Sequence, residues 1–219
     1  MISVVIPTAN SERHLPRCFD GLIPSAVRGM VREVIVSDAG SSDATLAIAD
    51  AAGAHVVHAR KGRGAQLVDG AAIAKSEWLL FLHPETALEP GWDVEAESFM
   101  SQEILERPRA AVFRFALEDF SGDARRAEAK AALRTMLFAL PYGDQGLLIP
   151  KRLYQKIGGY RALRDMEDAD LVRRIGRRRL VSLRSRAVNI ARPQKGMLRG
   201  AALTLLHVLR VPSRLLVNL

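Results

Sequence analysis

The sequence predicts an α/β protein with a mostly parallel central sheet flanked by helices. Short apolar runs that suit strands alternate along the chain with longer segments whose apolar residues recur at helical spacing. One run, Trp78 to Leu82, is too short for a helix and suits a strand buried on both faces, as in the centre of a parallel sheet. Polar residues follow several of these runs directly, which places them at the edge where α/β sheets bind ligands.

The first half of the chain alternates regularly. β-Branched residues predict strands at 2–6 and 33–38, a shorter strand is expected at 54–57, and the central strand follows at 78–82. The helix after the first strand begins near Asn10 or Ser11, which can cap it, and has apolar residues at helical spacing. Further helices are predicted at 45–52, after a Gly-Ser-Ser-Asp turn, and at 65–75, after a glycine-punctuated loop. Such alternation implies right-handed crossovers between parallel strands.

The second half is less regular. Apolar spacing predicts helices at 92–105, 124–140, 151–157 and 168–178, and strands at 111–117, 147–149 and 180–184. The third of these helices ends in two glycines, which commonly terminate helices. We find no repeat and no flexible linker, and expect one domain over residues 1–190 with a basic helical extension at 191–219.

Charge is distributed unevenly along the 219 residues, whose net charge is +8. Residues 150–219 hold 17 Lys and Arg against 4 Asp and Glu, whereas residues 1–149 are acidic on balance. This asymmetry indicates an anionic partner for the last third of the chain. Interleaved aromatic residues for base stacking are missing there, which argues against nucleic acid.

The single cysteine, Cys18, excludes an intramolecular disulfide and a cysteine zinc cluster, and it favours a reducing, cytoplasmic setting. Met1 leads straight into the first strand, so we expect no signal peptide. No apolar run reaches the length of about 18 residues that spans a membrane.

Six short motifs occur in a characteristic order. They are Pro7-Thr8-Ala9-Asn10, Asp38, Gly62-Arg63-Gly64-Ala65-Gln66, His83-Pro84-Glu85, Gly143-Asp144-Gln145-Gly146 and Met166-Glu167-Asp168. Together they resemble the family-two glycosyltransferases, which adopt the glycosyltransferase-A fold, a Rossmann-like fold of nucleotide-diphospho-sugar transferases. The likeness extends from Ile2 to about Arg178 and is closest to a bacterial subgroup associated with radical-SAM and selenoprotein genes.

The resemblance implies a nucleotide-sugar donor site. Asp38 would accept a hydrogen bond from a uracil imide N–H, and Pro7, Thr8 and Asn10 would wall the base and ribose pocket. Lys61 and Arg63 stand on a loop before a helix, where cations and a helix N-terminus attract a diphosphate, and Gln66 could reach the same ligand. The plainer alternatives are that Asp38 caps the helix after Gly40 and that the basic loop is merely solvated.

His83 and Glu85 occupy the positions where the family commonly has two acidic residues that bind a divalent ion. Such an ion offsets the charge that develops on the departing nucleoside diphosphate. Glu85 can still bind Mg²⁺ or Mn²⁺ through an oxygen, and an imidazole from His83 would favour Mn²⁺. The departure at both positions puts the metal affinity in question, and a strand-ending turn whose polar groups face water is the alternative.

Glu167 and Asp168 match the acidic pair of the family, in which the Asp is the catalytic base. A carboxylate beside the acceptor hydroxyl takes its proton during in-line attack at the anomeric carbon. Asp168 is therefore the expected base and Glu167 its orienting partner, although acidic residues also favour a helix N-terminus. Asp144 and Gln145, on a turn before a strand, are candidate donor or acceptor contacts, with a structural turn as the alternative.

Residues 195–219 lie beyond the resemblance and combine an apolar helical face with Lys and Arg. Such a helix can lie on an anionic membrane surface, on the inner face of the membrane, and bring a lipid-linked acceptor to the site. A helix that packs on the domain, or on a second subunit in a homodimer, is the other interpretation.

The sequence thus predicts a non-processive, inverting glycosyltransferase that uses a nucleotide-sugar, a UDP-sugar by the resemblance, and an unknown hydroxyl acceptor. The processive members carry a Gln-x-x-Arg-Trp motif, which is missing here. Two alternatives stay open. One is a catalytically silent nucleotide-binding relative; the other is a sugar-phosphate nucleotidyltransferase, although its basic glycine-rich loop after the first strand is replaced by Pro7-Thr8-Ala9-Asn10.

Overall fold

The computed structural model describes residues 1–102, 107–119, 122, 125–126, 128–129, 143–163 and 166–190. The predicted extension at 191–219 lies outside these residues, as does most of the predicted helix at 124–140. The strands are β1 (Ile2–Thr8), β2 (Val31–Asp38), β3 (His55–His58), β4 (Trp78–Phe81), β5 (Thr86–Leu88), β6 (Ala110–Leu117), β7 (Leu147–Pro150) and β8 (Leu180–Asn189). The helices are α1 (Leu15–Asp20), α2 (Ile23–Val27), α3 (Thr45–Ala51), α4 (Arg63–Ile73), α5 (Trp92–Ser101), α7 (Lys151–Lys156) and α8 (Glu167–Ile175).

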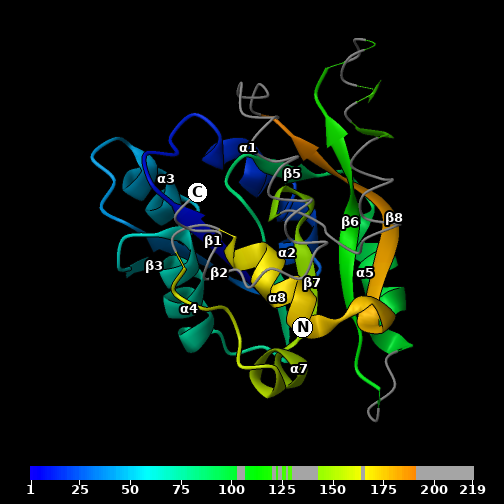
Figure 1. Ribbon diagram of the computed structural model, residues 1–219. Helices are drawn as coiled ribbons and strands as arrows, with labels where there is room; N and C mark the ends of the chain where they lie inside the picture. The colour runs from blue at the N-terminus through cyan, green and yellow to red at the C-terminus, as the bar shows by residue number, and fades with distance from the viewer. Residues whose placement is uncertain are drawn as a thin grey trace.

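These strands form one sheet in the order β3-β2-β1-β4-β7-β6-β8-β5 (Figure 1). The first four are parallel to one another, and β6 is parallel to β8. β7 is antiparallel to β4 and β6, and β5 is antiparallel to β8. The structure therefore confirms the α/β class and the mostly parallel sheet. It also brings the carboxyl ends of β1, β2 and β4 to one edge, where Thr8 pairs with Asp38.

Two apolar layers cover the sheet because alternate strand residues point to opposite faces. One layer packs α1, α2, α3 and α5 against side chains such as Val4, Leu80 and Phe113. The other packs α4, α7 and α8 against side chains such as Val5 and Phe81. In Figure 1, α4, α7 and α8 lie on the viewer's side of the sheet. The functional candidates come from the strand ends and from the helices of this second layer.

The approach of α4 to the sheet depends on a small residue. A Cβ on Gly70 would stand 2.6 Å from Cγ1 of Val5 and 3.3 Å from Cβ of Ser37, so only glycine lets the helix lie this close to β1 and β2. The close packing brings the first turn of α4 to the carboxyl ends of these strands. The predicted link between the glycine-rich loop and the strand edge therefore has a steric basis.

Some predicted boundaries were wrong for local reasons. The helix after the first strand is two short helices, because Pro24 has no N–H to continue the ladder of α1. It begins at Leu15 without the expected side-chain cap from Asn10 or Ser11. α8 ends at Ile175 rather than near Arg178, since Gly176 takes a φ of 82° and stops the helix.

The sheet also extends further than predicted. β8 continues to Asn189 because it pairs with both β6 and β5. The three-residue strand β5, which follows Glu85, was not predicted. In the part of the chain described here, no helix is both long enough and apolar enough to cross a membrane.

Candidate functional site

The loops after β1 and β2 are joined by hydrogen bonds that centre on Asp38. Its Oδ1 accepts from the hydroxyls of Thr8 at 2.9 Å and Ser41 at 2.5 Å, and its Oδ2 accepts from the backbone N–H groups of Gly40 and Ser41 at 2.8 Å each. These bonds lower the pKa of Asp38 against the opposing effect of burial, which is the larger single influence. A carboxylate has about four acceptor positions, so Thr8 and the turn that follows Asp38 already fill them.

The other residues predicted to wall a base pocket lie at the same edge. Asn10 takes a left-handed φ of 52°; its side-chain oxygen accepts from the N–H of Ser42 at 2.9 Å, and its own N–H donates to Ser41 Oγ at 2.8 Å. Pro7 and Thr8 are buried residues of β1 that pair with the end of β2. The structure thus brings Pro7, Thr8, Asn10 and Asp38 together, and their contact with a nucleotide stays a prediction.

Gln66 holds α4 to the strand ends. Its Nε2 donates to the carbonyls of Thr8 at 2.7 Å and Ser37 at 2.8 Å, and its backbone carbonyl accepts from Ser37 Oγ at 2.7 Å. The side chain is buried and both amide hydrogens are engaged. This arrangement gives Gln66 a structural role, while its predicted reach towards a ligand stays a prediction.

The basic loop before α4 meets the acidic pair at the start of α8. Arg63 Nε donates to Glu167 Oε1, although the two residues are 104 positions apart. Glu167 is fully buried, whereas the Arg63 side chain is 45% exposed and can turn towards a ligand from this position. Lys61 is exposed on the same loop. The candidate diphosphate cations and the candidate catalytic pair therefore form one cluster.

Burial is the largest influence on the pKa of Glu167. Removal from water raises its pKa, the charge of Asp168 raises it further, and Arg63 opposes both effects. Its second oxygen, Oε2, is buried and has no hydrogen-bond partner among the residues that the structure describes. An unpaired buried acceptor is costly, so this oxygen is placed to receive a hydrogen bond from a ligand.

Asp168 lies between two aromatic-ring side chains at the N-terminus of α8. Its Oδ1 accepts from the Tyr160 hydroxyl at 2.8 Å, and its Oδ2 stands 3.8 Å from Nε2 of His83. His83 follows β4, so the end of the central strand and the start of α8 face each other. The structure thus places His83 and Asp168, two candidates far apart in the sequence, side by side.

The His83 imidazole is suited to a neutral state. Within the described part of the chain, its Nε2 is buried and has no hydrogen-bond partner. Burial lowers the pKa of His83, the Arg63 charge acts in the same direction, and the charges of Asp168 and Glu85 oppose them. A neutral imidazole nitrogen without a partner is the form that binds a transition-metal ion.

Glu85 is half-buried and lies near α1, where its charge adds to the effect of burial in raising the pKa of the Cys18 thiol to about 12. Among the described residues no group of three or more His, Cys, Asp or Glu could hold a metal ion.

Asp144 and Gln145 form a short 3-10 turn before β7. Gln145 is buried, with its Nε2 donating to the carbonyl of Phe113 at 3.2 Å, and the carbonyl of Asp144 accepts from the Thr86 hydroxyl at 3.4 Å. These bonds fit the structural alternative, and donor or acceptor contacts of this turn stay a prediction.

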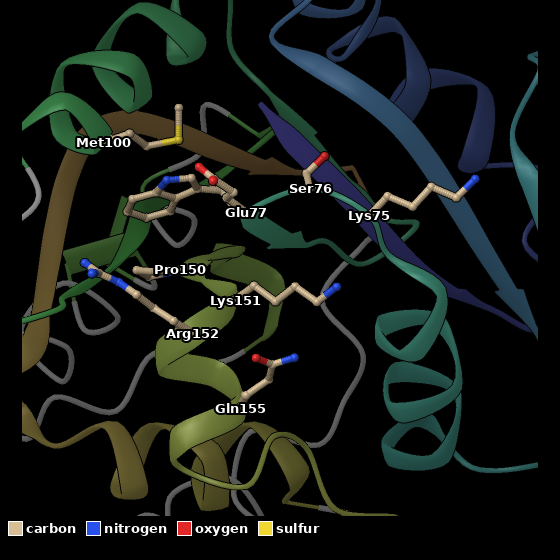
Figure 2. Close-up of a pocket in the computed structure, with 9 residues that line it drawn as sticks. Lys75, Ser76, Glu77, Met100, Pro150, Lys151, Arg152 and Gln155 are labelled. Atoms are coloured by element: carbon tan, nitrogen blue, oxygen red, sulfur yellow. The ribbon is translucent and has the colours of Figure 1, made fainter. Parts of the chain in front are cut away.

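A cavity of 440 Å³ lies away from this cluster, where β4 begins and β7 ends (Figure 2). Its walls include Lys75, Glu77, Lys151 and Arg152. Arg152 points away from the side towards which Lys75 and Lys151 extend, so the cations do not converge on one point (Figure 2). Size alone does not make this cavity the functional site.

Sequence reasoning missed Tyr160 and the pairing of Arg63 with Glu167. Tyr160 follows two glycines that were interpreted only as the end of a helix, and no spacing rule links it to Asp168 eight positions later. Only the fold shows that its hydroxyl contacts the candidate base.

Residues 3–103 match the family model described as glycosyl transferase family 2. This segment contains the loops that carry Pro7, Asp38, Arg63 and His83. The search of curated proteins found no match.

Solved structures match a larger part of the chain. Glucosyl-3-phosphoglycerate synthase from Mycobacterium tuberculosis, in complex with Mn²⁺ and uridine-diphosphate-glucose, has a TM-score of 0.67 and 22% identity, over 97% of this chain and 80% of that one. The chain has the glycosyltransferase-A fold. TarS from S. aureus, residues 1–349, has a TM-score of 0.66 and 16% identity, over 86% of this chain and 60% of that one. At these identities the likeness concerns the fold, whose sheet edge holds the cluster described above.

Proposed function

We propose that this protein is a non-processive, inverting glycosyltransferase that transfers a sugar from a nucleotide-diphosphate sugar, a UDP-sugar, to a hydroxyl acceptor. The observation that carries the proposal is the meeting of Arg63, His83, Glu167 and Asp168 at the carboxyl edge of the sheet. A cation can pair with the departing diphosphate, and a carboxylate can take the proton of an acceptor hydroxyl. The match of residues 3–103 to glycosyl transferase family 2 and a fold shared with a synthase bound to Mn²⁺ and UDP-glucose support it.

The loops after β1 and β2 would hold the nucleoside. Pro7, Thr8 and Asn10 would line the base and ribose site, and Asp38 would fix the turn beneath it. A uracil imide N–H would bind Asp38 by replacing the Ser41 hydroxyl on Oδ1. Of the four donors to Asp38, this hydroxyl alone is a side-chain group of the turn that follows it. Gln66 would keep the strand ends in register with α4.

Arg63 and Lys61 would bind the diphosphate. The Arg63 guanidinium is already at the cluster and partly exposed, so it can pair with phosphate oxygens at the cost of its bond to Glu167. The charge that builds on the leaving diphosphate would be offset by these cations.

The two carboxylates would activate the acceptor. The acceptor oxygen attacks the anomeric carbon as the bond from that carbon to the diphosphate oxygen breaks, and the bonding electron pair leaves with the nucleoside diphosphate. Asp168 takes the proton of the acceptor hydroxyl, and Glu167, through its unpaired Oε2, orients the acceptor. In-line attack from the face opposite the leaving group inverts the configuration. Asp144 and Gln145 are proposed to border the sugar.

A divalent ion, Mn²⁺ or Mg²⁺, fits the residues present. His83 offers a buried nitrogen without a partner, and Glu85 a half-buried carboxylate. Such ions are commonly held by one or two protein ligands together with substrate phosphates, and an imidazole favours Mn²⁺. When bound, the ion would act as a Lewis acid that stabilises the leaving diphosphate.

Our proposals on the acceptor, the cellular location and the oligomeric state rest on the sequence. We propose a cytoplasmic protein that makes peripheral contact with the membrane through residues 195–219 and uses a lipid-linked acceptor; packing of that segment in a homodimer is the competing arrangement. We also propose the relationship to the bacterial subgroup associated with radical-SAM and selenoprotein genes, on the motifs of the sequence.

A catalytically silent nucleotide-binding relative is the second candidate. It is favoured by the replacement of the acidic metal motif by His83 and Glu85 and by the pairing of Arg63 with Glu167. Such a protein would bind a nucleoside diphosphate without turning over any nucleotide-sugar.

The test measures nucleoside diphosphate released from UDP-, GDP- and CDP-sugars in the presence of Mn²⁺, with water as the acceptor. We expect release from a UDP-sugar and a loss of about 100-fold or more in Asp168→Asn, since a general base contributes about 10²–10⁴-fold. Asp69→Asn, which changes a half-buried carboxylate of α4 that pairs with Arg60, is the matched control and should leave the rate unchanged. Binding of UDP without release from any donor would establish the silent relative instead.

A further inference from the structure

Tyr160 contacts the proposed base directly. It lies in the loop between α7 and α8, and its hydroxyl donates to Asp168 Oδ1 at 2.8 Å. Tyr160 is 6% exposed and Asp168 is 8% exposed, so little water competes for this bond. Tyr160 is not one of the residues predicted from the motifs.

The direction of the hydrogen bond is fixed by chemistry. Burial raises the pKa of Tyr160 well above its ordinary value, and the charge of Asp168 acts in the same direction. The phenol therefore keeps its proton and acts as the donor, while the carboxylate accepts. Oδ1 of Asp168 is occupied in this way, and Oδ2 is left to face His83 at 3.8 Å.

Several contacts hold the Tyr160 ring in place. Its ring meets that of Phe81 edge-on, with centroids 4.9 Å apart and planes at 83°, which links it to the last residue of β4. Its backbone N–H donates to the Tyr154 hydroxyl at 3.0 Å. The preceding Gly159 has a φ of 59°, and a Cβ there would stand 2.8 Å from Cζ of Tyr154. The loop can approach Tyr154 this closely only with glycine at that position.

A second link ties the same loop to α8. Arg174 Nη1 donates to the carbonyls of Ile157 at 2.7 Å and Gly159 at 2.6 Å, and Arg174 also pairs with Asp170 at 2.5 Å. The loop is thus fastened to α8 at the position of Asp168 and again about two turns later. Tyr160 is held between β4 on one side and α8 on the other.

We infer that Tyr160 is a positioning residue that fixes the orientation of the Asp168 carboxylate, leaving Oδ2 directed towards the acceptor hydroxyl. The inference rests on the proposed function, since it assigns Asp168 the role of base. It adds a residue that lies outside the motifs of the donor site and acts through Asp168 rather than on the substrate.

The test compares Tyr160→Phe with Tyr154→Phe in the hydrolysis of UDP-glucose with Mn²⁺. Tyr160→Phe removes only the hydroxyl on Asp168, and we expect kcat to fall roughly 10- to 100-fold while KM changes less than about twofold, because small misplacements of reacting groups cost up to about 10²-fold. Tyr154→Phe removes the hydroxyl that receives the Tyr160 N–H, and should lower stability while keeping kcat within about threefold. An unchanged kcat in Tyr160→Phe, or equal falls of kcat in both variants, would overturn the inference.

A double-mutant cycle in urea unfolding separates this inference from the proposed function. Tyr160→Phe and Asp168→Ala, alone and together, should show non-additive losses of stability, because the two side chains share a hydrogen bond that each variant removes. Non-additivity with a tyrosine-dependent kcat supports the positioning role. Non-additivity with an unchanged kcat keeps the contact but refutes the role, whereas a wild-type protein that hydrolyses no nucleotide-sugar refutes the proposed function itself.

Discussion

Replacement of Arg63 by Gln should destabilise the protein in a pH-dependent way. Glu167 is fully buried and Arg63 is the cation that faces it. Removal of one partner from a buried pair costs about 3–5 kcal/mol, and because the Arg63 side chain is 45% exposed, we discount this to about 1–2 kcal/mol at pH 8. The loss arises because ionised Glu167 is left buried without its cation.

The pH dependence follows from the raised pKa of Glu167 in the folded protein. A carboxyl of this kind contributes stability below its unfolded pKa and loses it as the pH rises through the folded pKa. Loss of Arg63 raises the folded pKa further, so the variant and the wild type should differ less at pH 4.5, near the ordinary pKa of a glutamate, than at pH 8.

Urea unfolding at the two pH values provides the assay. Arg60→Gln is the matched control, since Arg60 pairs with Asp69 on the surface and the lowered pKa of Asp69 keeps that pair ionised at both pH values. We expect a much smaller loss in the control, equal at pH 4.5 and pH 8. If Arg63→Gln lowered the free energy of unfolding equally at both pH values, the loss would not arise from the ionised Glu167 carboxylate, and the reasoning would be refuted.

Three further predictions test other parts of the structure. Gly64→Ala should lower the free energy of unfolding by about 2 kcal/mol in urea titrations, because its Cβ would stand 2.4 Å from the carbonyl oxygen of Arg161 and 2.7 Å from that of Leu163; an unchanged stability would contradict this packing. Cys18 should not react with Ellman's reagent at pH 8 until the protein unfolds, since burial and a pKa of about 12 suppress the thiolate, and rapid reaction of the native protein would contradict it. Asp38→Ala should cost about 2–3 kcal/mol by the same unfolding assay, because four donors lose their acceptor, whereas a neutral effect would show that water replaces the carboxylate.

The pattern of apolar residues predicted the central strands of the sheet correctly. β1 and β4 are buried along their whole length and β2 over its last four residues, and the order of strands and helices indicated that their carboxyl ends share an edge. That topology was enough to bring together Thr8, Asp38 and His83 as expected candidates.

Contacts between distant segments could not be predicted in the same way. The Arg63–Glu167 pair joins the first residues of α4 and α8, which are 104 positions apart, and no local sequence rule predicts that these two charges will meet. The hydroxyl of Tyr160 reaches Asp168 only because the loop turns back at Gly159.

The sequence also could not show which polar side-chain atoms already have hydrogen-bond partners within the protein. The motifs mark Asp38 and Gln66 as ligand contacts, but the structure shows their polar atoms engaged with the strand ends and the turn beside them. A residue type indicates what a side chain can bind, whereas its neighbours decide which of its atoms are still available. The short strand β5 was not predicted because three residues are too few to show the alternation of apolar and polar residues that marks a strand.

The most direct test of the proposed donor site is the thermal shift of the purified protein with UDP, GDP and CDP, each with and without Mn²⁺. A ligand that binds only the folded state raises Tm by mass action. We predict that UDP raises Tm in a Mn²⁺-dependent way and that Glu85→Ala abolishes the metal dependence. A rise with UDP alone would remove Glu85 from the metal role, and no rise with any nucleoside diphosphate would contradict the account of the strand edge as a donor site.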